Sequence, residues 1–223
     1  MSGSVLRFDE INAMDGKRNP FVANDATVLV YARKCVRRYA ALKRRLVTWD
    51  RDDDYAVMLW VWELYNELWG YYTDMLSECA AESYGYVSSA EAPAGIVDDY
   101  VSTSQPVEGW VPRNEWERKR SYRFEGVVAA KGTGRSMTDA VDSARKRWGR
   151  QMSQSADDVT AAAMLRAYAD AGATRVKWVT QHDDRVCSTC GPRDGKTYSI
   201  GNAPQYPAHW GCRCLLVPVV TAR

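Results

Sequence analysis

The sequence places four of its six cysteines, together with one of its two histidines, inside residues 187–214. Cys187 and Cys190 form a C-x-x-C pair, a spacing that lets two thiolates on one tight turn bind a single ion. Beyond the loop 191–208, the other potential ligands follow an H-x-x-C-x-C pattern: His209, Cys212 and Cys214. Such a tight cluster indicates a metal site rather than scattered disulfide bridges, so this segment is expected to fold around an ion.

Zinc suits this donor set, because it takes four nitrogen or sulfur ligands in tetrahedral geometry. Five candidates compete for four positions; the preferred set is Cys187, Cys190, His209 and Cys212, with Cys214 as the substitute for His209. Four protein ligands leave no position for water, which indicates a structural ion. Metal binding can supply roughly 10 kcal/mol of folding free energy to a segment that buries little apolar surface. Unlinked buried thiols and a redox C-x-x-C pair are the alternatives.

Two amphipathic helices are predicted near the N-terminus. Apolar residues recur at helical spacing from Val28 to Leu46 and, more strongly, from Met58 to Cys79. The acidic run 50–54 separates the two patterns and can begin the second helix, because carboxylates favour helix N-termini. Since the connection is short, the two helices are expected to pack as an antiparallel hairpin.

The C-terminal part alternates between helix and strand signals. The apolar positions from Ala140 to Trp148 predict a third helix, and a further helix is expected from about Ala156 until Gly172 stops it. Alternating residues then predict a strand over 176–180, and a closing strand over 215–220.

These signals predict a mainly helical α+β fold, with an N-terminal helical hairpin followed by a small α+β module that a zinc knuckle closes. The expected division is a helical region over 1–83, an irregular connector over 84–134 that is rich in Ser, Gly, Pro and Ala, and the zinc-stapled module over 135–223.

The composition is that of an ordinary globular protein, with 46% hydrophobic and 26% charged residues and a formal net charge of +2. It excludes a disordered tail, a collagen-like fibre and a small disulfide scaffold. No export signal and no apolar run of the ~20 residues that a membrane span needs is present, so we expect a soluble protein that is kept in a reducing cytoplasm.

Two surface features suggest binding partners. Basic side chains on the first helix can contact DNA phosphates, although a solvated helix face is the simpler interpretation: Arg33, Lys34, Arg37, Arg38, Arg44 and Arg45. Nine Trp and 13 Tyr residues suit half-buried surfaces, and the aromatic residues of the second helix are expected in the core or in a partner interface: Trp60, Trp62, Trp69 and Tyr72.

The C-terminal segment carries three linked motifs: W-x-T-x-x-D-D-R-V-C-x-x-C, then D-G-K, then P-x-H-x-x-C-R-C. Together they resemble the C-terminal signature of phage Mu F-like head morphogenesis proteins, the minor head proteins of tailed phages. The likeness covers roughly residues 135–220, and one departure is Trp210, where the family usually has proline. The matching residues are Trp178, Thr180, Asp183, Asp184, Arg185, Val186, Cys187, Cys190, Asp194, Gly195, Lys196, Pro207, His209, Cys212, Arg213 and Cys214.

The resemblance implies a low-copy virion component at or near the portal that assists head assembly, DNA packaging or DNA ejection. Its implied partners are the portal protein, the major capsid protein and packaged double-stranded DNA, with the host cytoplasm as its location during assembly and oligomers only within the particle. No enzyme activity is expected, because neither H-E-x-x-H nor G-x-S-x-G is present. The alternatives are a zinc-dependent nuclease that uses His182, Asp183 and Asp184, and a DNA-binding zinc module.

Overall fold

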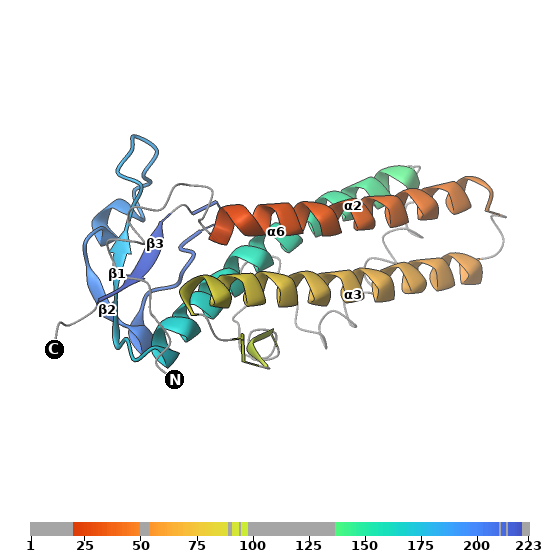
Figure 1. The fold of residues 1–223 in the computed structure, drawn as a ribbon. Coiled ribbons are helices and arrows are strands. Elements are labelled where there is room, and N and C mark those ends of the chain that lie inside the picture. The colour runs from red at the N-terminus through yellow and green to blue at the C-terminus, as the bar shows by residue number, and fades with distance from the viewer. Residues whose placement is uncertain are drawn as a thin grey trace. The chain divides into compact units, whose positions relative to one another are not determined.

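The computed structural model describes residues 20–49, 54–88, 91–93, 95–97, 137–209, 211–212 and 214–219. Its elements are three long helices, α2 (Pro20–Val47), α3 (Asp54–Val87) and α6 (Met137–Asp170), three strands, β1 (Arg175–Val179), β2 (Thr197–Ser199) and β3 (Leu215–Pro218), and the 3-10 turns η2 (Gly191–Arg193) and η3 (Ile200–Asn202) (Figure 1). The predicted class, a mainly helical α+β fold with a small C-terminal sheet, is confirmed. No helix in the described ranges is long and apolar enough to span a membrane.

The chain divides into two compact units. The helical unit comprises residues 26–76 and 98–155, and the sheet unit comprises residues 1–25, 77–97 and 156–223. The regions predicted from composition follow one another along the chain. In the structure, by contrast, each long helix contributes one segment to each unit.

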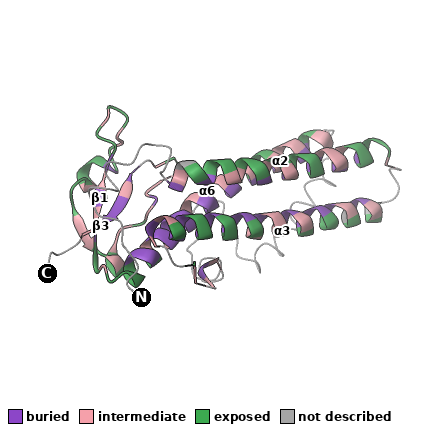
Figure 2. Cartoon of the chain, in the orientation of Figure 1, coloured by how far each residue is buried: buried purple, intermediate pink, exposed green. Residues whose placement is uncertain are grey.

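In the helical unit, α2 and α3 form the predicted antiparallel hairpin. Arg38 of α2 pairs with Glu67 of α3 at 2.6 Å, and Arg45 pairs with Glu63 at 3.1 Å. Because the residue numbers rise along α2 while those of the partners fall along α3, the two helices run in opposite directions. Both helices alternate between buried and exposed positions along their length (Figure 2).

Helix α6 completes the core of the helical unit. Trp148 is 1% exposed and its ring lies 5.7 Å from that of Tyr72, whose hydroxyl donates to Ser155 Oγ at 2.9 Å. The expectation of two separate helices around residues 140–148 and 156–171 was wrong, because α6 is continuous. Met152 is also fully buried, so the buried face of α6 is continuous between the two predicted apolar patterns.

In the sheet unit, three antiparallel strands lie in the order β2-β1-β3. Val176 and Trp178 of β1 are fully buried, and the strand pairs Val179 with Leu215 of β3 and Val176 with Tyr198 of β2. The strands predicted around 176–180 and 215–220 are therefore confirmed as β1 and β3. Strand β2 carries no alternating pattern and forms only through its pairing with β1.

A buried polar network joins the helix segments of the sheet unit. The side-chain amide of Asn24 donates to Ser83 Oγ and to Thr160 Oγ1, which lie on α3 and α6. All three residues are nearly inaccessible to solvent. Hydrogen-bonded partners of this kind fix the register of packed helices, because an unpaired buried polar group costs free energy.

Replacing Trp148 by alanine is expected to lower the free energy of unfolding by about 3–5 kcal/mol, since it leaves a cavity in the helical unit. Urea unfolding at low protein concentration measures this loss. The matched control is Trp62→Ala, because Trp62 is 46% exposed and its truncation removes less buried surface than that of Trp148, which is 1% exposed. Equal losses in the two variants would contradict the assignment of Trp148 to the core.

Candidate metal centre

The first ligand pair lies on the loop over residues 180–194 between β1 and β2, which we call the excursion. Two backbone hydrogen bonds hold its returning end against Trp178 of β1. The backbone N–H of Gly195 donates to the Trp178 carbonyl at 2.8 Å, and the Trp178 N–H donates to the Lys196 carbonyl at 2.9 Å. Gly195 has φ of +72°, a conformation that favours glycine because it has no Cβ. The D-G-K motif thus returns the chain to the sheet after the C-x-x-C turn.

The C-x-x-C turn is held by its own backbone. The N–H groups of Cys190 and Gly191 donate to the Cys187 carbonyl at 3.2 and 2.9 Å. The Cys190 N–H also lies 3.4 Å from Cys187 Sγ. These bonds place the two thiols on one side of a single turn, as the spacing predicts.

The second ligand segment reaches the same end of the sheet because β3 pairs antiparallel with β1. Leu215 lies opposite Val179, so the residues just before β3 meet those just after β1. The Tyr206 hydroxyl donates to the Cys214 carbonyl at 3.0 Å, and the Tyr206 ring packs edge-on against Trp178 at 5.6 Å. The core of the sheet unit therefore positions this segment.

The five predicted ligands come together around Cys190. Its sulfur lies 3.4 Å from His209 Nε2 and 3.8 Å from Cys212 Sγ, while Cys187 Sγ lies 3.1 Å from the same imidazole nitrogen. Two groups have all their ligand atoms within 4.8 Å of one another: Cys187, Cys190 and His209, and Cys190, Cys212 and Cys214. The cluster could hold a metal ion.

The separations within the cluster exclude a disulfide and are close to those of ligands that share an ion. A disulfide requires sulfur atoms about 2.05 Å apart, and all six cysteines are free thiols. Bonds of about 2.3 Å to sulfur and about 2.0 Å to nitrogen give tetrahedral edges of about 3.5–3.8 Å. Two of the three measured separations fall within about 0.1 Å of that range, and the third is shorter by about 0.4 Å.

The thiols of this cluster differ in their ease of ionisation. The backbone N–H of Cys190 lowers the pKa of Cys187 to about 7, so a large share of this thiol is ionised at neutral pH. Burial and the neighbouring thiols raise the pKa of Cys190, and burial and Cys212 raise that of Cys214. Several thiolates can form together here only if a cation compensates their charge.

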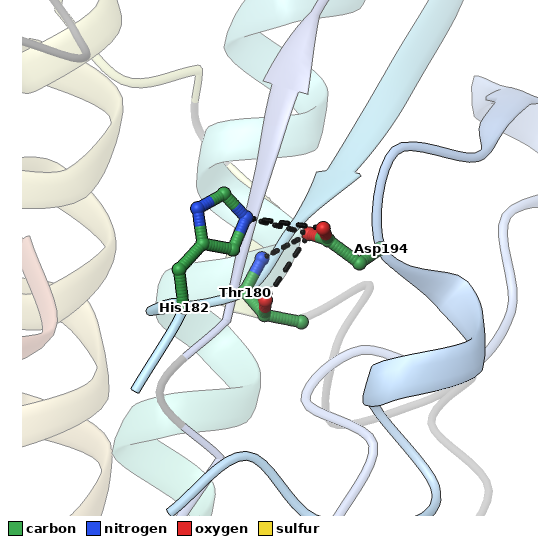
Figure 3. Close-up of polar contacts among 3 residues, drawn as sticks. All are labelled: Thr180, His182 and Asp194. Atoms are coloured by element: carbon green, nitrogen blue, oxygen red, sulfur yellow. Dashed lines mark hydrogen bonds and ion pairs between the residues drawn. The ribbon is translucent and has the colours of Figure 1, made fainter. Parts of the chain in front are cut away.

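A second polar cluster fastens the start of the excursion to its end (Figure 3). Asp194 accepts hydrogen bonds from the Thr180 backbone N–H at 2.8 Å and from its hydroxyl at 3.1 Å. His182 Nε2 lies 3.0 Å from Asp194 Oδ2, and His182 has φ of +55°. The Thr180 N–H donor, followed by His182, lowers the pKa of Asp194. Sequence reasoning missed this link, because these residues are 12 and 14 positions apart.

Asp183, next to the knuckle, accepts hydrogen bonds within its own turn. Asp183 accepts from the Arg185 backbone N–H at 3.1 Å, and its carbonyl accepts from Val186 N–H at 3.2 Å. Among the described residues, the groups that could hold a metal include neither His182 nor Asp184, which the nuclease alternative requires.

The six basic residues of α2 separate into distinct environments. Arg38 and Arg45 pair with glutamates of α3, and the Lys34 ammonium lies 4.0 Å from the centre of the Tyr31 ring. The other three are exposed, with no ion pair to a described residue: Arg33, Arg37 and Arg44. Contact of this face with DNA stays a prediction.

The four aromatic residues expected in the core or at a partner interface also lie in different environments. Tyr72 is fully buried, so we assign it to the core of the helical unit, and Trp69 packs beside it at 5.5 Å. Trp60 lies beneath the Arg45 guanidinium at 5.7 Å. Trp62 is the most exposed of the four, at 46%.

No family model matches the chain, and neither a curated protein nor a solved structure matches it.

Asp194→Ala is expected to make the Thr180 amide hydrogen exchange severalfold faster, because its acceptor is removed. Since the pKa of Asp194 is lowered in the folded chain, the carboxylate stabilises the link fully above the ordinary value of about 4 and loses this effect as the pH falls through its own lower pKa. The difference from the wild type should shrink there. The control is Asp184→Ala, and equal exchange at Thr180 in both variants at neutral pH would refute the link.

Proposed function

We propose that this protein is a structural and assembly component of a tailed-bacteriophage head, a minor head protein that lies at or near the portal and capsid. It assists head assembly, DNA packaging or DNA ejection, and it is present in the host cytoplasm before it enters the virion. The observation that carries this proposal is the convergence of the phage-like motif residues on one cluster: the C-x-x-C pair, D-G-K and H-x-x-C-x-C meet at one end of a small sheet.

The metal in this proposal is zinc, held for structure. Three thiols and an imidazole form the soft donor set that Zn²⁺ prefers, and Cys190 lies close to His209 on one side and to Cys212 on the other. When bound, zinc neutralises the thiolates and fastens the two ligand segments together. His209 and Cys212 hold one segment, while Cys187 and Cys190 hold the other.

A rigid cap suits an assembly protein. The segment between β1 and β3 has few buried side chains, so hydrophobic burial alone gives it little stability. A surface that is ordered before it meets its partner avoids the entropy cost of ordering on binding. The exposed residues of the excursion would then contact the portal protein or the major capsid protein as one preformed surface.

Cys190→Ser is expected to abolish stoichiometric zinc binding and to accelerate amide exchange throughout 180–219, because this thiol belongs to both ligand groups. The helical unit should keep its protection. The matched control is Cys35→Ser, which alters a buried thiol of the helical unit and should leave the zinc content unchanged. Unchanged zinc content in Cys190→Ser would contradict the proposed ligand set.

The assembly role is tested in particles of the phage that encodes the chain. We expect the protein to copurify with heads or portal rings and to crosslink there to the portal or major capsid protein. Free protein should neither cleave duplex DNA nor bind it strongly at physiological salt. Absence from particles, or zinc-dependent DNA cleavage that His182→Ala abolishes, would overturn the proposal in favour of the nuclease.

A further inference from the structure

Among the described residues, the most exposed large apolar side chains lie on two elements. All of them lie on α2 and α3, within the helical unit. These residues are Leu29, Val30, Val36, Val47, Tyr55, Leu59 and Trp62. Exposed positions recur along both helices (Figure 2). Exposed apolar side chains gathered in this way mark an interaction surface.

On α2, aliphatic and cationic side chains share one face, the α2 stripe, which consists of Leu29, Val30, Arg33, Val36, Arg37 and Arg44. Steps of three, four and seven residues bring these positions to the same side of a helix. The side chains of Arg33, Arg37 and Arg44 are exposed. The stripe therefore combines apolar surface with positive charge.

On α3, four exposed residues follow the 4-3-4 spacing of a coiled-coil seam, and we call them the α3 stripe: Tyr55, Leu59, Trp62 and Asn66. A second row with the same spacing is buried inside the helical unit: Val57, Val61, Leu64 and Leu68. Helix α3 thus presents two rows suited to helix packing, one buried and one exposed.

The contact between α2 and α3 within one chain shows which chemistry these helices use. Cations come from α2 and aromatic rings come from α3: Arg45 lies 5.7 Å from the ring centre of Trp60, and Lys34 lies 5.7 Å from that of Tyr71. The outer stripes repeat this division, with arginines on α2 and with Tyr55 and Trp62 on α3. Cations over aromatic faces attract, so the two stripes are complementary to each other.

The stripes also match in length. The α2 stripe extends about 22 Å from Leu29 to Arg44, and the α3 stripe extends about 17 Å from Tyr55 to Asn66, at 1.5 Å per residue. Each covers three to four helical turns, which is enough for a helix-on-helix contact. A row of phosphates would use the arginines but would leave the aliphatic side chains and the whole α3 stripe without a partner.

We propose that the occupant of each stripe is a second copy of this chain: the α2 stripe of one copy packs against the α3 stripe of the next. The contact repeats between copies the pairing that α2 and α3 make within one chain. It joins two different surfaces, so it is heterologous, and it propagates into a ring or an open row. The inference rests on the surfaces of the helical unit and does not depend on the assignment to a phage head.

Two double variants of the full chain test this contact. Leu29→Asp with Val36→Asp breaks the α2 stripe, and Leu59→Asp with Trp62→Asp breaks the α3 stripe. All four positions are exposed, so both proteins should keep the circular dichroism and the melting temperature of the wild type. A control with Arg147→Asp changes the net charge by the same two units on the exposed surface of α6.

Analytical ultracentrifugation from micromolar to near-millimolar concentration should show association of the wild type and the control. Each stripe variant alone should stay monomeric, whereas an equimolar mixture of the two should form a one-to-one dimer through the single intact junction. A wild type that is monomeric throughout, or a stripe variant that associates alone as the wild type does, would overturn the proposal. The proposal would also be overturned if the wild type did not associate and instead bound a short DNA duplex through its α2 stripe.

Discussion

The C-terminal fold depends on the convergence of two distant chain segments on the sulfur of Cys190. Antiparallel pairing of β1 with β3 brings the segment before Leu215 to the segment after Val179, and Cys190 then lies within ligand distance of both groups. Tyr206 and Trp178 fix this approach from the core. Because several thiols meet here, the cluster could hold a cation, which would stabilise the arrangement and order the polar excursion.

The two units offer different kinds of recognition. The sheet unit would present a cap whose order comes from metal binding and from the link between Asp194 and Thr180. The helical unit has a packed core around Trp148 and carries its exposed apolar side chains on α2 and α3. Under the proposed function, one surface would bind a particle component while the other would bind a neighbouring copy.

The sequence predicted what periodicity and ligand spacing encode. The helical hairpin, β1, β3 and all five members of the cluster follow from local patterns. Features that require tertiary pairing were missed: Asp194 meets Thr180 only because the excursion returns to β1, and β2 exists only beside β1. The continuous α6 was missed because polar residues around Met152 concealed its buried face. Likewise, the split of the arginines needs the positions of Glu63 and Glu67 on α3.

X-ray absorption spectroscopy at the zinc edge on the purified full chain tests the central claim most directly. The account predicts one zinc per chain in a four-coordinate shell, with three sulfur ligands at about 2.3 Å and one nitrogen ligand at about 2.0 Å. A shell of four sulfurs would place Cys214 in the position of His209 and keep the structural role. A protein without metal, or a shell that contains a water oxygen, would contradict the account.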